Sequence, residues 1–263
     1  MHTPILTLIT DFGTRDGYVG AMKGSILTMA PNVAIHDITH GITPQQVWEG
    51  AWCLRRAAPR FPPGTVHLAV VDPGVGSSRS GIVIETTNYL LVGPDNGLLA
   101  LAAQDDGIQR IVEIEDESGE AWQRSATFDG LSLFAPVAAQ LLAGVPLEDI
   151  GPEAEDMVEL PEPEPARQGH FLEGEVVLFD RFGNAMTNIS TAHVEPYGIE
   201  HIYLADGAEV QYIGYYAELA GSTGLGAIFN SDGRLELALY GESAQRRFNL
   251  RVGQKIRVLL RPP

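Results

Sequence analysis

An acidic, proline-rich stretch past the middle of the chain divides it into two parts of different texture. Residues 151–169 contain the run Glu-Asp-Met-Val-Glu-Leu-Pro-Glu-Pro-Glu-Pro. Prolines at this density remove backbone donors, so the run fits neither the interior of a helix nor a central strand. We therefore predict a semi-rigid extended linker over 153–169, which separates a domain of residues 1–152 from a domain of residues 170–263.

The first part alternates apolar, strand-like runs with helix-like segments. Because the strands are continuously apolar, the pattern predicts an α/β domain whose sheet is buried and mostly parallel. A helix over Pro44–Ala58 is expected to take Thr43 as its N-cap and Pro44 as its first residue. The predicted strands are Ile5–Ile9, Val33–Ile38, Val66–Val71, Ile82–Thr86 and Tyr89–Val92, and the other predicted helices are Gly17–Met29 and Leu131–Ala143.

The second part has short β-prone runs between turns of glycine, asparagine and aspartate. Such spacing is typical of a small all-β barrel or sandwich. The runs are Glu175–Phe179, His201–Leu204, Val210–Ile213, Ala227–Phe229, Leu235–Leu239 and Lys255–Leu260.

The charge balance excludes several classes of partner. The 263 residues include 17 Lys and Arg against 34 Asp and Glu, a formal net charge of −17. This excess of acid argues against nucleic-acid binding and against docking on anionic membranes. One cysteine, Cys53, allows no intrachain disulfide. With no basic and apolar leader and no apolar run of roughly 20 residues, we expect a cytoplasmic protein.

Two acidic residues follow predicted strands directly, where ligands bind in open α/β sheets. Asp11 comes after the first strand, in Thr-Asp-Phe-Gly, and Asp72 comes after Val66–Val71, in Asp-Pro-Gly-Val-Gly-Ser-Ser-Arg. Arg79 ends that second motif, and it either folds back on Asp72 or reaches a ligand anion. Plain structural roles stay open: Asp11 as a turn or capping residue, and Asp72 with Arg79 as an ion pair that stabilises a tight turn.

Three further polar motifs are candidate loops with two possible meanings. Gly-Pro-Asp-Asn-Gly at 93–97 is strong turn chemistry. Asp129 precedes a predicted helix, either as a site carboxylate or as an acid that the helix dipole favours. Asp180, Phe182 and Asn184 offer a carboxylate for an ammonium group, an aromatic ring for stacking and an amide for an adenine edge. A plain loop is the alternative for this last group.

Metal binding is not expected. His36 and His40 stand four residues apart with Asp37 between them, as in a zinc-binding helix. Their segment is strand-like, however, so the two rings would not share one helical face.

Taken together, these motifs resemble the SAM hydrolase family (SAM hydroxide adenosyltransferases that form adenosine from S-adenosyl-L-methionine), which is related to fluorinases and chlorinases. The resemblance runs through nearly the whole chain. Its motifs are Ile-Thr-Asp-Phe-Gly-Thr-Arg-Asp-Gly-Tyr-Val-Gly-Ala-Met-Lys-Gly from Ile9, Asp-Ile-Thr-His from Asp37, Val-Asp-Pro-Gly-Val-Gly from Val71, Gly-Pro-Asp-Asn-Gly from Gly93, Phe-Ala-Pro-Val-Ala-Ala from Phe134, and Phe-Gly-Asn from Phe182 with Thr187-Asn188.

The resemblance implies a Rossmann-like N-terminal domain and a β-barrel C-terminal domain. It also implies a homotrimer whose SAM sites lie between subunits. The family's reaction replaces methionine at ribose C5′ by water in a single displacement and uses neither a metal nor another cofactor.

The resemblance also implies roles for individual residues. Asp72 and Arg79 match two members of an Asp-Arg-His set that positions and activates water. Tyr215–Tyr216 would add a stacking ring. Substrate contacts are implied at six positions: Asp11 for the ribose diol, Phe128 beside the ribose, Asp180 for the methionine ammonium, Phe182 and Asn184 for adenine, and Ser231 for the methionine end.

One departure concerns the reacting centre. The family's His-Gly-Arg-Asp is here Asp129-Gly130-Leu131-Ser132. Three outcomes follow: Asp129 accepts the proton from water, or the chain binds SAM or a nucleoside with weakened turnover, or it uses a halide. Halide is the least favoured, because carboxylates beside the nucleophile repel an anion at short range.

Overall fold

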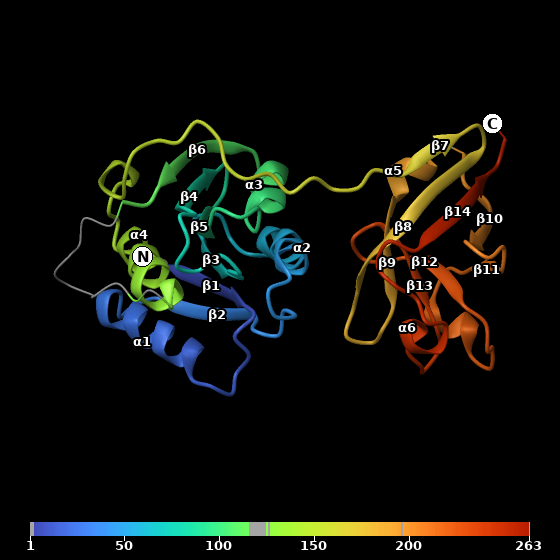
Figure 1. Cartoon of the computed structure of the whole chain (residues 1–263), viewed down its shortest axis with the longest axis horizontal. Coiled ribbons are helices and arrows are strands. Elements are labelled where there is room, and N and C mark those ends of the chain that lie inside the picture. The colour runs from blue at the N-terminus through green and yellow to red at the C-terminus, as the bar shows by residue number, and fades with distance from the viewer. Residues whose placement is uncertain (1–2, 116–124, 126, 196, 263) are drawn as a thin grey trace. The chain divides into compact units, whose positions relative to one another are not determined.

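The computed structural model describes residues 3–115, 125, 127–195 and 197–262. The chain separates into two compact units, Met1–Leu160 and Pro161–Pro263. The first is an α/β unit and the second is a β unit (Figure 1).

The α/β unit is built on a six-stranded sheet in the order β2-β1-β3-β5-β4-β6. The pairs β1–β2, β1–β3 and β3–β5 are parallel, whereas β4 runs antiparallel to β5 and to β6. The predicted Rossmann-like class is therefore confirmed. The strands are β1 (Ile5–Thr10), β2 (Ala34–Thr39), β3 (Val66–Val70), β4 (Gly81–Thr86), β5 (Leu90–Pro94) and β6 (Ile108–Glu113).

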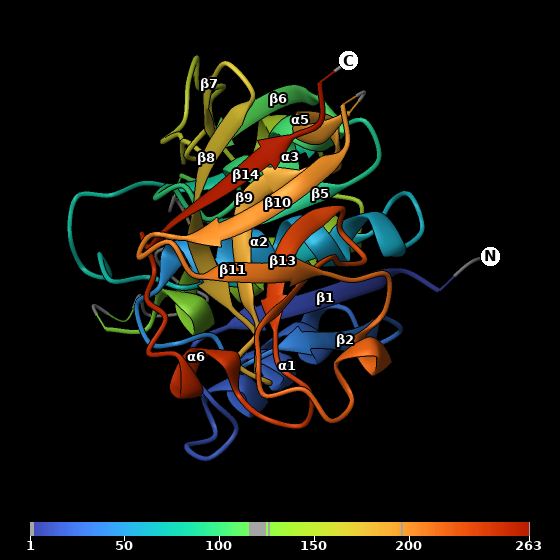
Figure 2. The ribbon, with the colours of Figure 1, turned by 90° about the vertical axis from the view of Figure 1, so that its right-hand side faces the viewer.

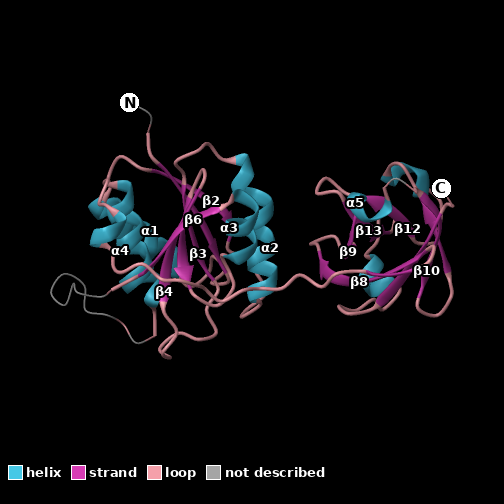
Figure 3. Cartoon of the chain, turned by 90° about the horizontal axis from the view of Figure 1, so that it is seen from above, coloured by secondary structure: helices cyan, strands magenta, loops and turns pink. Residues whose placement is uncertain are grey.

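Helices cover both faces of this sheet, as Figure 3 shows from above. On one face α1 (Tyr18–Met29) packs against α4 (Ala135–Leu142), and on the other α2 (Val47–Ala57) packs against α3 (Ala100–Asp106). The α1–α4 face buries Leu6, Met22, Leu68 and Phe134. Strands covered on both faces bury nearly every side chain, which explains their continuous apolar runs.

The start of α2 differs from the expectation. The helix begins at Val47 with Gln46 as its N-cap, not at Pro44 with Thr43 as the cap. Gln45 adopts a left-handed φ of 67°, and its N–H donates to Asp11 Oδ2 at 2.8 Å. This contact between separate segments holds the chain out of the helix and outweighs the local capping preference.

A π-helical turn, η2 (Gly130–Phe134), leads into α4. The Ala135 N–H bonds the Gly130 carbonyl, five residues back. Pro136 follows at the start of α4, where its ring would clash with the carbonyl four residues earlier in a regular α-helix. The wider turn removes that clash, and π turns of this kind recur at functional sites.

The β unit is a closed barrel of seven strands in the order β8-β9-β13-β12-β11-β10-β14 (Figure 2). The ring closes where β14 pairs with the first half of β8, and β7 is added to that same half. The predicted barrel is confirmed. Its strands are β7 (Ala166–Gln168), β8 (Phe171–Phe179), β9 (Ala185–Ser190), β10 (Ile199–Leu204), β11 (Glu209–Tyr212), β12 (Gly226–Phe229), β13 (Arg234–Ala238) and β14 (Lys255–Leu260), with short helices α5 (Thr191–Val194) and α6 (Ala244–Arg247).

The acidic proline-rich stretch is mostly extended, and each end is fixed to its own unit. Val158 N–H donates to Asp95 Oδ1 at 2.8 Å in the α/β unit. In the β unit, Arg234 pairs with Glu162, and Asn188 Nδ2 donates to the Pro163 carbonyl at 2.8 Å. The last residues of the predicted linker, Ala166–Gln168, form β7.

Candidate active site

The residues predicted to carry chemistry in the α/β unit lie at one edge of its sheet. Thr10 pairs with Val70 in the parallel register of β1 and β3. Asp11 follows Thr10 directly and Asp72 lies two residues after Val70, so both leave the sheet at the same edge. Carboxyl ends of adjacent parallel strands are where open α/β sheets bind ligands.

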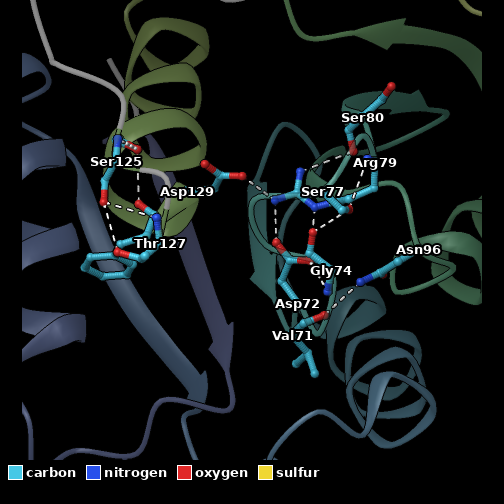
Figure 4. A network of polar contacts seen from close by, with 12 residues as sticks. Val71, Asp72, Gly74, Ser77, Arg79, Ser80, Asn96, Ser125, Thr127 and Asp129 are labelled. Atoms are coloured by element: carbon cyan, nitrogen blue, oxygen red, sulfur yellow. Dashed lines mark hydrogen bonds and ion pairs between the residues drawn. The ribbon is translucent and has the colours of Figure 1, made fainter.

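Arg79 joins two buried carboxylates at this edge (Figure 4). Its Nε donates to Asp72 Oδ1 at 3.0 Å, and its Nη2 pairs with Asp72 Oδ2 and also with Asp129 Oδ2. The side chains of Asp72, Arg79 and Asp129 are only 5%, 10% and 3% exposed. The sequence motif left open whether Arg79 turns to Asp72 or to a ligand. Here it turns to Asp72, and Asp129 joins the same pair.

The surrounding loop fixes these groups in place. Gly74 N–H donates to Asp72 Oδ1 at 3.2 Å, and the Arg79 guanidinium lies over the Phe134 ring at 5.2 Å from its centroid. Asn96 Nδ2 donates to the Val71 carbonyl at 2.9 Å, which fixes the peptide just before Asp72. The sequence motif around Asn96 predicted a turn, but nothing in it indicated this second role.

The electrostatics favour a bound cation over an anion. Two carboxylates share one guanidinium, so the ionised group carries a formal charge of −1. In a site this buried, charge interactions are stronger than in bulk water. A carboxylate accepts hydrogen bonds through two oxygens, so the group is able to orient a water molecule and to receive its proton.

Asp129 is held in place through its neighbours in the main chain. Ser132 Oγ donates to the Phe128 carbonyl at 3.1 Å and accepts from Ser125 N–H at 3.1 Å. The Phe128 carbonyl also accepts from Leu131 N–H at 3.1 Å. Ser132 stands where the family pattern has aspartate, and it fixes the turn that directs Asp129 toward Arg79.

Phe128 lies in a cluster of three aromatic rings beside this turn. Its ring makes edge contacts with Phe12 and Tyr18, at centroid distances of 5.5 Å and 5.1 Å. A Cβ at Gly130 would lie 3.1 Å from the Phe128 ring and 3.3 Å from that of Phe12. Glycine therefore lets the turn approach the rings closely.

The histidines near this edge serve the fold. His40 Nδ1 bonds Thr10 Oγ1 at 2.9 Å, and His40 Nε2 lies 3.1 Å from Asp37 Oδ1. Burial raises the pKa of Asp37, but hydrogen bonds from Lys23 and His40 outweigh it, and the net pKa is below the usual value. Among the residues that the structure describes, no group of three or more His, Cys, Asp or Glu is placed to hold a metal ion.

In the β unit, the loop between β8 and β9 brings Asp180, Phe182 and Asn184 together. Asp180 Oδ1 accepts from the backbone N–H groups of Phe182 and Asn184 at 2.9 Å and 2.8 Å, and Oδ2 accepts from Asn184 Nδ2 at 2.9 Å. The Phe182 side chain is 75% exposed. Gly183 has a left-handed φ of 83°, and a Cβ there would lie 2.0 Å from Ser243 Oγ.

These three residues line a cavity of about 660 Å³. That volume is in the usual range for a small-molecule site. Ser231 is not brought to the cavity: it lies exposed in the turn between β12 and β13. The remaining lining residues are Arg181, Tyr216, Leu239, Tyr240, Gly241, Glu242, Ser243 and Arg246.

Two family models match the chain and together cover most of it. Residues 6–151 match the SAM hydroxide adenosyltransferase N-terminal domain, and residues 174–257 match the C-terminal domain.

In the part of the chain that the structure describes, no helix is long and apolar enough to cross a membrane.

Individual proteins are similar over nearly their full length. An (R)-S-adenosyl-L-methionine hydrolase from Methanocaldococcus jannaschii is 37% identical, covering 97% of this chain and 95% of its own. A fluorinase from an Actinoplanes species is 28% identical, covering 97% of each chain. The crystal structure of an uncharacterized conserved protein from Thermotoga maritima has a TM-score of 0.87 and 33% identity, covering 97% of this chain and 99% of its own.

Both halves of the chain thus match in order and in fold, and the paired carboxylates, the bridging arginine and the barrel loop occupy the matched regions. The chain belongs to the SAM hydroxide adenosyltransferase family.

Proposed function

We propose that this protein hydrolyses S-adenosyl-L-methionine to adenosine and L-methionine. The observation that carries the proposal is the bridging of Asp72 and Asp129 by Arg79 at the ligand-binding edge of the sheet. Relatives named (R)-S-adenosyl-L-methionine hydrolase, 36–42% identical to this chain, support the same reaction and the same substrate.

In the proposed reaction, water attacks ribose C5′ opposite the sulfonium. The new bond joins the water oxygen to C5′, the C5′–S bond breaks, and its electron pair goes to sulfur, which leaves as the thioether of methionine. The water proton passes to a carboxylate of the Asp72–Asp129 pair. Because the sulfonium is already a good leaving group, the gain comes from aligning one water and excluding others.

Arg79 has two tasks in this scheme. It holds the two carboxylates at a fixed separation, and it compensates part of their charge so that both stay buried. The remaining negative charge favours the cationic sulfonium and disfavours a halide nucleophile.

The remaining contacts belong to the proposal as well. In the α/β unit, Asp11 would bind the ribose hydroxyls and Phe128 would pack beside the ribose. In the β unit, Asp180 would meet the ammonium group through its remaining acceptor capacity, and Phe182 and Asn184 would bind adenine. Ser231 is the weakest of these assignments, because it lies outside the barrel cavity.

We further propose that the protein works as a cytoplasmic homotrimer without a cofactor. Two of the six proposed substrate contacts lie in the α/β unit and four in the β unit, and the family resemblance implies that SAM is bound between subunits. Mixing an Asp72→Asn protein with an Asn184→Ala protein tests this arrangement. If subunits combine their intact halves, the mixture regains part of the activity that each variant lacks, and mass measurement by light scattering gives a trimer.

The reaction is tested by incubating the purified protein with SAM in ¹⁸O-water containing chloride. Mass spectrometry should find labelled adenosine above the level of a protein-free control and of the Asp72→Asn variant. An Asp206→Asn variant, altered in an exposed barrel turn, should keep the wild-type rate. If SAM stays intact and bound to the protein, the chain is a binding protein and not a hydrolase. If 5′-chloroadenosine forms, the nucleophile is a halide and not water.

Exchange of Asp129 for the family's histidine tests the aspartate centre. We expect Asp129→His to lose most of the turnover, because the Arg79 bridge then lacks its second carboxylate. A large gain in turnover would instead identify the wild-type protein as a weakened hydrolase.

A further inference from the structure

A buried carboxylate lies on β13, on the face of the strand opposite to the barrel-core residues Leu235 and Leu237, and it contacts the lining of the cavity that Asp180 and Phe182 share. Glu236 stands in β13 and is only 4% exposed. Its Oε1 accepts from the Tyr216 hydroxyl at 2.7 Å, and its Oε2 accepts from Asn230 Nδ2 at 3.0 Å. Burying a carboxylate is costly unless it is hydrogen-bonded, and these two contacts give each of its oxygens a donor.

The Asn230 side chain is fixed by the turn in which it stands. Its Oδ1 accepts from the backbone N–H groups of Asp232 and Arg234 at 3.0 Å and 3.1 Å. The amide nitrogen is therefore the atom that faces Glu236, and a flipped amide would lose both backbone bonds. Asn230 is therefore a rigid partner for Glu236 Oε2, and the other carboxylate oxygen, Oε1, bonds Tyr216 at the cavity.

Tyr216 is the partner on the cavity side. It opens a short 3-10 turn, η4 (Tyr216–Leu219), and it lines the cavity together with Asp180. Burial is the largest cause that raises the pKa of Tyr216 above its usual value, and the hydrogen bond to Glu236 is the next. The hydroxyl therefore keeps its proton and acts as the hydrogen-bond donor to Glu236. The side chain is 44% exposed, so the ring is presented at the cavity wall instead of being covered by the barrel.

We propose that Glu236 is a positioning residue that locks the Tyr216 ring as one wall of the cavity, where the ring stacks on the adenine base of the substrate. This inference rests on the proposed function. A tyrosine on a surface turn normally rotates between rotamers and loses that freedom on binding. A ring already held by a buried carboxylate loses less, and the ligand binds more tightly for that reason.

The test measures the affinity for adenosine by titration calorimetry and the KM and kcat for SAM, with the full-length protein. Tyr216→Phe keeps the ring but removes its anchor, and Glu236→Met removes the anchor from the other side. Each should weaken adenosine binding and raise KM by about three- to tenfold. The kcat should stay unchanged, because Asp72, Arg79 and Asp129 are untouched.

Two further variants separate positioning from charge and from stability. The double variant should lose no more affinity than either single one, since both break one contact. Glu236→Gln should remain close to wild type, because its amide accepts from Asn230 and donates to the Tyr216 oxygen. Tyr212→Phe, in β11 and outside the cavity, is the matched control.

The inference is overturned if Tyr216→Phe leaves both adenosine affinity and KM unchanged, or if the losses of the two single variants multiply. A Glu236→Gln loss as large as that of Glu236→Met would assign the effect to charge instead of ring position. Failure of the wild-type protein itself to bind adenosine and to form it from SAM would refute the proposed function, a separate result.

Discussion

His67 makes the stability of the α/β unit depend on pH, in a direction that its surroundings determine. The ring is fully buried in β3 and lies 5.7 Å from the Phe61 ring and 5.0 Å from the Tyr89 ring, between centroids. Its Nδ1 bonds Thr7 Oγ1 at 2.7 Å. Burial lowers the pKa of His67 from 6.5 to about 4.

The magnitude follows from these two pKa values. The folded state holds His67 neutral, so its contribution to stability is complete above pH 6.5 and is lost as the pH falls toward 4. Between pH 8 and pH 5 the unfolded chain takes up a proton that the folded unit largely refuses. The free energy of unfolding should fall by about 2 kcal/mol over that interval, out of a limit of about 3 kcal/mol at lower pH.

Urea unfolding followed by tryptophan fluorescence is the assay. All three tryptophans of the sequence lie before residue 161, so their signal reports the unit that contains His67. His67→Gln keeps a partner for Thr7 but has no imidazole to protonate, and its loss of stability from pH 8 to pH 5 should be smaller than that of wild type by about 2 kcal/mol. Exposed His36 serves as the control through His36→Gln. Equal losses in the wild type and in His67→Gln would refute the reasoning.

Three other predictions concern the supports of the site. Arg79→Leu should destabilise the α/β unit by about 3–5 kcal/mol by leaving two buried carboxylates unbridged, and adding Asp129→Asn should restore part of that loss in urea unfolding; no recovery would contradict the bridge. Gly93→Ala places a Cβ 2.4 Å from a backbone oxygen of β3 and should cost about 3 kcal/mol or more, whereas Gly24→Ala, with open space around it, should not lower the melting temperature. Asp95→Ala releases the extended acidic segment, and limited proteolysis should cut there about tenfold faster than in wild type; an unchanged rate would show that other contacts hold it.

The sequence predicted the architecture where one physical signal dominated. The run Val66–Val71, apolar except for His67, marks a strand buried on both faces, and the structure has this strand at Val66–Val70, close to the predicted bounds. The β9 strand was not predicted, because its polar residues suggested a loop. Thr187 and Asn188 are buried there through side-chain hydrogen bonds to the Leu235 and Pro163 carbonyls.

The candidate site was less accessible to sequence reasoning. Asp72 and Asp129 are 57 positions apart, and nothing local to either residue indicates that one guanidinium joins them. Residue types at strand ends predicted candidates, and the family resemblance suggested their grouping. Glu236 lay outside both kinds of reasoning, because its partners come from two turns, one before β12 and one after it, and no motif in the sequence links them.

The π-helical turn after Asp129 bears on how the side chain at this position can vary, if it reacts as proposed. Its main-chain bond runs from Ala135 N–H to the Gly130 carbonyl, Pro136 follows it, and Asp129 makes no side-chain capping hydrogen bond at its start. A new side chain at that position therefore starts from the same backbone and the same direction toward Arg79. If Asp129 is the reacting group as proposed, exchanging that group requires a single codon change, and a library that varies only this position would sample alternative chemistries beside Arg79.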